Sequence, residues 1–144
     1  MFPSSRSIAF AALAVLAIPA AAQEAATIDW SVAEAAFQEE RANGVEMRRG
    51  RAASTCVAYW QEHLYAHRRG DYPPEALELF DPELADPGEA ELNALVYSTA
   101  MSSNPHAYRN AQDAAKRRMT KLLAGDAKEL RTFFHKLGEC SFGE

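Results

Sequence analysis

Apolar residues recur three and four positions apart along most of the chain after residue 30, which is the spacing of one face of an α-helix. Val, Ile and Thr are sparse there, and the alternation that is typical of strands is absent. The pattern therefore predicts an all-α fold. Capping residues and glycines divide the chain into a compact bundle of five or six helices.

Local signals predict where these helices begin and end. Ser31 and Glu34 form a capping box at the first start, proline at the first helical position marks two later starts, and glycine ends most of the helices. The predicted segments are Ser31 to Asn43-Gly44, about Ala52 to Arg69, about Pro74 to Phe80, Asp86 to about Ser102-Ser103, Asn104 to Gly125, and Asp126 to Gly138.

Three of these segments carry an apolar stripe that predicts which side faces the core. The stripes are Leu92, Leu95, Val96, Thr99 and Ala100, then Tyr108, Ala111, Ala115, Met119 and Leu122, and finally Leu130, Phe133, Phe134 and Leu137. We expect the members of all three stripes to point inward.

The first 22 residues follow another pattern. Arg6 precedes an unbroken apolar run at residues 8–18, and small residues continue to Ala22. A charge, a short apolar run and an Ala-x-Ala site together form a secretory signal peptide, and the run is too short to span a bilayer. We expect cleavage after Ala22, which leaves residues 23–144 as a single helical domain in the periplasm or outside the cell.

Charge excludes some partners. Without Arg6 the chain keeps 14 basic residues against 20 acidic ones, a net charge of −6. An acidic protein is poorly suited to bind nucleic acid or an anionic lipid surface. No segment after the signal approaches the ~18 consecutive apolar residues of a membrane helix. We therefore expect a soluble mature chain with no nucleic-acid partner and no transmembrane segment.

The chain has two cysteines, Cys56 and Cys140. In an oxidising compartment an even number of cysteines favours disulfide formation, and two cysteines allow one intramolecular bond. The bond would close a loop of roughly 85 residues, for which the chain-entropy model gives about 4 to 5 kcal/mol. We expect this disulfide to close the bundle.

The segment from Ala52 to Arg69 places Cys56, Trp60, His63 and His67 on one narrow stripe, because the spacing is three and four residues. A histidine pair one helical turn apart can bind Zn²⁺ or Cu²⁺ if a third ligand completes the site. The alternative is a pair of core histidines hydrogen-bonded to a carbonyl, a tyrosine or an aspartate. We favour core histidines and expect no cofactor.

Charge is strongly segregated along the chain. Between Arg69 and Arg109 the net charge is −8, whereas residues 109–136 carry a net charge of +5. One interpretation is a solvated acidic segment that packs beside the basic helix. The other is an acidic docking surface for a cationic partner. Its expected members are Glu75, Glu78, Glu89 and Glu91.

No phosphate-binding loop, nucleophile elbow, Cys-x-x-Cys pair or haem-attachment motif is present in the sequence. The sequence therefore favours a non-enzymatic periplasmic binding protein of the inhibitor, immunity or chaperone kind. Its partner would be a basic envelope protein. The alternative is a metal-binding or catalytic protein centred on His63 and His67.

Overall fold

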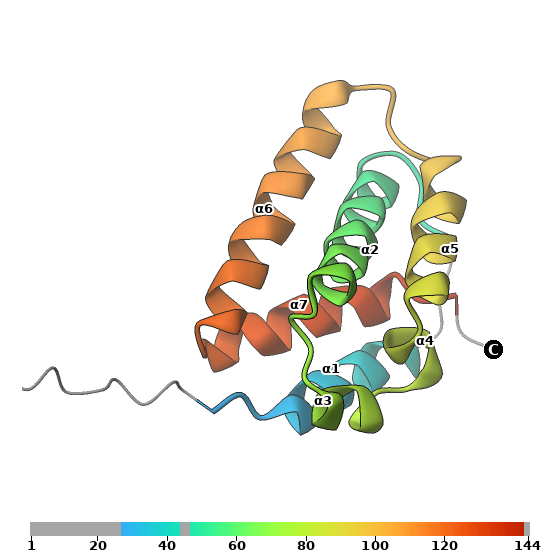
Figure 1. Cartoon of the computed structure of the whole chain (residues 1–144). Coiled ribbons are helices and arrows are strands. Elements are labelled where there is room, and N and C mark those ends of the chain that lie inside the picture. Colours follow the sequence, from blue (N-terminus) through green and yellow to red (C-terminus); the bar gives the residue numbers. More distant parts are fainter. Residues whose placement is uncertain (1–26, 44–46, 143–144) are drawn as a thin grey trace, which may run out of the picture.

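The computed structural model describes residues 27–43 and 47–142 (Figure 1). The predicted signal peptide lies outside these residues. The described part contains seven α-helices, and its only bridge of the β type is an isolated one between Gly50 and Met101. The helices are α1 (Trp30–Arg41), α2 (Arg51–Arg69), α3 (Pro74–Leu79), α4 (Pro82–Ala85), α5 (Pro87–Ser98), α6 (Pro105–Leu123) and α7 (Ala127–Glu139).

The predicted all-α bundle is confirmed. The described residues hold one helix more than the six predicted segments, because the short helix α4 lies between α3, which was predicted, and α5. Asp81 caps α4 by accepting a hydrogen bond from the Glu83 N–H, and Pro82 stands at its first position. None of the helices in the described part of the chain combines the length and the apolar composition needed to cross a membrane.

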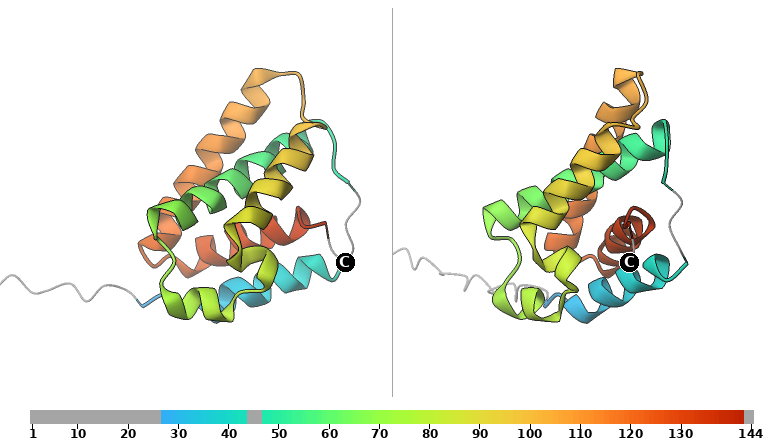
Figure 2. Two further views of the ribbon diagram at one scale, coloured as in Figure 1. Left: turned by 45° about the vertical axis from the view of Figure 1, so that its right-hand side comes forward. Right: turned by 90° about the vertical axis from the view of Figure 1, so that its right-hand side faces the viewer.

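Helix α2 is at the centre of the arrangement. It packs against α5, α6 and α7, while α5 and α6 flank it and do not contact each other. In Figure 1, α6, α2 and α5 rise steeply, and α7 and α1 run across below them. Helices α1 and α7 pack along each other, and the two views of Figure 2 show them side by side.

Aromatic side chains fill the space between these helices. Trp30 of α1 makes edge-on contacts with Tyr72, Phe80 and Phe134 at centroid distances of 5.5 to 6.5 Å. Edge-on geometry is favourable because a ring edge is positive and a ring face is negative. These contacts join α1, α7 and the chain around α3 into one core.

The predicted disulfide is present. Cys56 of α2 and Cys140, the residue that caps α7, have their sulfur atoms 2.01 Å apart and their Cα atoms 5.4 Å apart. Next to the bond, the Trp60 indole N–H donates a buried hydrogen bond of 2.9 Å to the Cys140 carbonyl. The end of α7 is therefore fixed to α2 by one covalent bond and one hydrogen bond.

Three predicted helix ends are wrong. Helix α5, which was predicted to end near Ser102-Ser103, ends at Ser98. Helix α1 begins two residues earlier than predicted because Asp29, not Ser31, is the N-cap and accepts from the Ser31 N–H at 3.1 Å. Gly138 does not end α7, which continues to Glu139. A Cβ atom at Gly138 would lie 2.3 Å from the Phe37 carbonyl oxygen, so this glycine allows α7 to approach α1 closely.

Candidate functional site

The exposed face of α5 is the first candidate site, and it overturns one sequence prediction. Leu92 and Leu95 were expected in the core, but they are 51% and 63% exposed. The buried face of α5 consists instead of Ala90, Ala94 and Tyr97, together with Asn93. In the same predicted stripe Thr99 is exposed, and Val96 and Ala100 are half-buried.

Side-chain size explains this reversal. Ala90 and Ala94 are one turn apart on the side of α5 that is buried, and α5 packs mainly against α2. Small side chains let two helices approach closely, whereas leucines at those positions would hold them apart. The larger side chains Leu92 and Leu95 then point away from α2. The other two predicted stripes, on α6 and α7, do face inward, although Tyr108 is only half-buried.

Beside the exposed leucines lies an open hollow of about 690 Å³, which we call the α5 hollow. Its apolar wall combines Leu92 and Val96 with Phe142, and the Phe142 ring stacks on Tyr97 at 4.7 Å. The residues lining the hollow are Arg41, Asp81, Pro82, Glu83, Glu89, Leu92, Asn93, Val96 and Phe142.

Two of the acidic residues in the hollow are already engaged. Arg41 lies 2.8 Å from an Asp81 oxygen and 3.7 Å from a Glu83 oxygen. Glu83 also accepts hydrogen bonds from the Asn93 amide at 3.0 Å and the Ser141 hydroxyl at 2.6 Å. Glu89 is exposed and makes no ion pair with any residue of the described part. The carboxylate available at the rim is therefore that of Glu89.

The four glutamates expected on a docking surface are all exposed, but they come from two helices. Glu75 and Glu78 lie on α3, and Glu89 and Glu91 lie on α5, which does not contact α3. A Glu91 carboxylate oxygen is 3.6 Å from the Arg68 guanidinium, and both of these side chains are exposed. Only the α5 pair borders the exposed leucines, since Glu89 lies three residues before Leu92 and Glu91 lies four residues before Leu95.

The acidic segment does not pack beside the basic helix, contrary to one of the two interpretations of the sequence. Helix α5 contacts α2 but does not contact α6, and in Figure 1 the two helices flank α2. Arg118 and Lys121 of α6 pair instead with Glu129 of α7. The acidic segment forms its ion pairs with arginines of α1 and α2 instead, so the basic residues of α6 do not neutralise it.

The stripe on α2 faces the core, with Cys56, Trp60 and His63 buried and His67 half-buried. His63 Nε2 donates to the Leu84 carbonyl at 2.9 Å, and His67 Nε2 donates to the same oxygen at 2.7 Å. His63 Nδ1 is thus free to accept from the Tyr72 hydroxyl at 2.7 Å.

Burial, and after it the charge of the neighbouring His67, lowers the pKa of His63 to about 3, although the bond to Leu84 opposes the shift. Burial also lowers the pKa of His67. Both imidazoles are therefore neutral at pH 7. Within the described residues, no third His, Cys, Asp or Glu joins this pair in a group that could hold a metal ion. Metal binding by the pair stays the alternative hypothesis.

Sequence reasoning missed Arg41 and Phe142 as parts of the hollow. Arg41 reaches Asp81 across 40 positions of sequence, and Phe142 follows the last helix, where no periodic pattern indicates its position. The exposed leucines were visible in the sequence but were assigned to the core. Comparison of the chain with protein-family models, with curated proteins and with solved structures finds no match.

Proposed function

We propose that this protein is an exported, non-enzymatic binding protein that holds a basic, amphipathic segment of a partner protein against α5. The observation that supports this proposal is the pair Leu92 and Leu95, each more than half exposed and bordered by Glu89 and Glu91. Inhibitors, immunity proteins and holding chaperones all work by such contacts. The signal peptide expected at residues 1–22 supports an encounter in the periplasm or outside the cell.

The leucines supply the apolar part of the interaction. Covering a fully exposed leucine contributes about 1.5 to 3 kcal/mol, and Leu92 and Leu95 still have about half of that surface in contact with water. Val96 and Phe142 extend the apolar wall into the hollow. A contiguous apolar face of this kind, rimmed by charge, is typical of a protein interaction site.

The carboxylates select a basic partner. Glu89 lacks an ion pair in the described part of the chain, and the α5 flank receives no basic residue from α6. A lysine or arginine of the partner would meet Glu89 and Glu91 on either side of the leucines. Charge complementarity of this kind speeds encounter and fixes the register of the complex. Arg41 already neutralises Asp81 and Glu83 deeper in the hollow.

A labelled synthetic helical peptide of leucine and lysine provides the test, with fluorescence anisotropy as the readout. We expect it to bind, and to bind more weakly in 0.5 M salt because exposed charges are screened beyond about 8 Å at physiological ionic strength. Two control peptides separate the contributions. One replaces lysine by glutamate and the other replaces leucine by serine, and neither should bind.

Matched variants locate the contact on the protein. Glu89→Lys/Glu91→Lys should weaken peptide binding at least tenfold, whereas Glu75→Lys/Glu78→Lys makes the same change in net charge on α3 and should have a smaller effect. All four positions are exposed, so circular dichroism should show intact helices in both variants and in the fourfold reversal. If affinity survives the fourfold reversal and 0.5 M salt, the proposal fails.

Leu92→Gln/Leu95→Gln tests the apolar half of the surface. Both side chains already lie largely in water, so the free energy of unfolding should change by less than about 0.5 kcal/mol, while peptide binding should be lost. Unchanged affinity in this variant would also contradict the proposal.

A further inference from the structure

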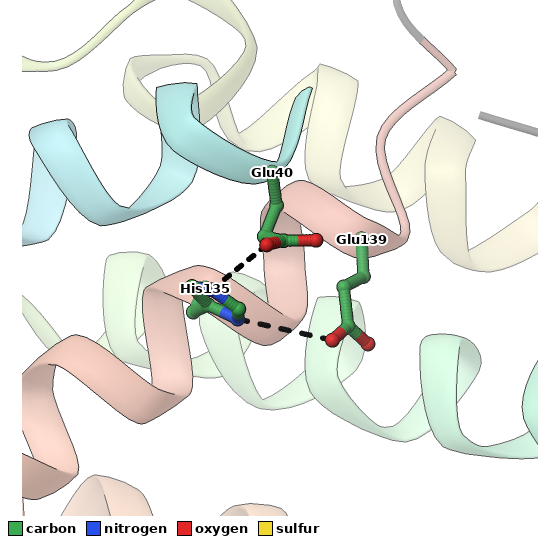
Figure 3. Close-up of side chains that lie close together, drawn as sticks. All are labelled: Glu40, His135 and Glu139. Atoms are coloured by element: carbon green, nitrogen blue, oxygen red, sulfur yellow. Dashed lines mark ion pairs between the residues drawn. The ribbon is translucent and has the colours of Figure 1, made fainter. Parts of the chain in front are cut away.

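The seam between α1 and α7 brings together three metal-ligating side chains. Glu40 of α1 faces His135 and Glu139 of α7, which are four residues apart on one side of that helix (Figure 3). His135 Nε2 is 2.9 Å from a Glu40 oxygen, and His135 Nδ1 is 3.8 Å from a Glu139 oxygen. Among the described residues, this is the one group of three such side chains whose ligand atoms lie within 4.8 Å of one another.

We propose that Glu40, His135 and Glu139 form a binding site for a divalent transition-metal ion, with Zn²⁺ the best match. Imidazole and carboxylate are both zinc ligands, at about 2.0 to 2.2 Å. Ligand atoms around a tetrahedral zinc ion are therefore about 3.4 Å apart. One ring nitrogen of His135 and one oxygen of each carboxylate lie within 4.8 Å of one another, so side-chain rotations that shorten these distances bring all three ligand atoms onto one ion.

The exposure of the cluster suits an ion that keeps water in its coordination shell. His135 is 33% exposed, and Glu40 and Glu139 are each 21% exposed. An ion can therefore reach the ligands from solvent. Three protein ligands leave the fourth tetrahedral position to water, as in zinc sites that remain open.

The backbone holds the ligands in position before any ion binds. A Cβ atom at Gly138 would lie 2.3 Å from the Phe37 carbonyl and 3.0 Å from the Glu40 Cβ, so α1 and α7 touch at this turn. Cys140, next to Glu139, is bonded to Cys56. Ligands on rigid elements lose little backbone freedom on binding, which favours affinity.

One neighbouring cation opposes metal binding and offers a sharp test. Lys136 forms an ion pair with the outer oxygen of Glu139, while the other oxygen faces His135. The Arg48 guanidinium donates to the Glu139 backbone carbonyl at 3.1 Å. It forms no ion pair with the Glu139 carboxylate among the described residues. Removing the Lys136 charge should therefore strengthen binding at Glu139 rather than weaken it.

The experiment titrates Zn²⁺ into the disulfide-bonded protein by isothermal calorimetry, with the same titration repeated in variants. We expect one ion per chain. His135→Gln, Glu40→Gln and Glu139→Gln should each weaken binding at least tenfold, and Lys136→Met should tighten it. His106→Gln is the matched control, since His106 is an exposed helical histidine outside the cluster, and it should leave the affinity unchanged.

The outcomes are distinct. Absence of binding, or binding that all three ligand variants leave intact, overturns the proposal. Loss of binding in His67→Gln with the ligand variants unaffected also overturns it and moves the ion to the pair on α2. Urea unfolding of each variant checks the fold, and the tighter binding expected of Lys136→Met keeps the proposal falsifiable if a ligand variant does not fold.

Discussion

Two buried tyrosines differ in what their hydroxyl groups meet. The Tyr72 hydroxyl lies 2.7 Å from His63 Nδ1, whereas the buried Tyr97 hydroxyl has no hydrogen-bond partner among the described residues. We expect Tyr72→Phe to cost about 1 to 2 kcal/mol of unfolding free energy, because it leaves a buried nitrogen unpaired. Tyr97→Phe removes an unpaired polar atom and should be neutral or stabilising. Urea unfolding measures the free energy of unfolding of both variants. An equal decrease in the two variants would contradict these hydrogen-bond assignments.

His63 should make the fold sensitive to mild acid. Its pKa falls from 6.5 to about 3 on folding, chiefly through burial. Below pH 6.5 the unfolded chain therefore binds a proton that the folded chain excludes, and stability decreases as the pH falls, by up to about 1.4 kcal/mol per pH unit. His67 shifts in the same direction.

Unfolding free energies at pH 7.5, 6.5 and 5.5 measure this effect, and the range stays above the titration of most carboxylates. His63→Gln should remove most of the slope, because glutamine does not titrate. A wild-type stability that stays flat between pH 6.5 and 5.5 would show that His63 is not held neutral by burial.

At the residue scale, the spacing of residues predicted which side of a helix faces the core, but it did not predict the hydrogen-bond partners of individual side chains. The positions of Cys56, Trp60, His63 and His67 place them on one face of α2, and that face does turn toward the core. Nothing in the spacing shows that the Leu84 carbonyl, 21 positions beyond His63, would accept from both imidazoles. The same holds for Glu40 and His135, which no sequence pattern connects.

At the scale of single helices, the periodic pattern predicted existence and approximate length well and predicted the buried face less reliably. It succeeded for α7, where Leu130, Phe133, Phe134 and Leu137 are all buried. The pattern failed for α5, because it considers the hydrophobicity of the side chains and not their size. The face that packs on α2 carries the alanines, and the leucines remain outside.

Gly138 tests the contact between α1 and α7. In an ordinary helix interior, replacing glycine with alanine stabilises by about 1 kcal/mol. Here the new Cβ atom would lie 2.3 Å from a backbone oxygen of α1, so we expect Gly138→Ala to cost about 1 to 3 kcal/mol, as overpacking does. Chemical denaturation measures whether the substitution raises or lowers the free energy of unfolding. A stabilised variant would mean that the two helices do not approach this closely.

At the scale of the whole molecule, the disulfide joins α2 to the end of α7 across 84 positions. Reduction should lower the free energy of unfolding by up to about 4 kcal/mol, and by less if the reduced chain keeps structure when unfolded. Urea unfolding with and without reductant measures the difference. Alkylation of both thiols in non-reduced, denatured protein would exclude the bond.

The arrangement of helices also decides how charge is distributed. Because α5 contacts α2 but does not contact α6, the basic residues of α6 do not neutralise the acidic segment. The sequence indicated the segregation along the chain, but not which helices become neighbours on folding. An exposed apolar face bordered by carboxylates then remains on α5.

That this face of α5 is the binding surface is the central claim, and nuclear magnetic resonance tests it most directly. The backbone amide spectrum of the labelled protein is recorded while the leucine and lysine peptide is added. We expect the shifts to concentrate on residues 89–98 and on Phe142, with α6 unaffected. Shifts that concentrate on α6, or that spread evenly over the molecule, would contradict the claim.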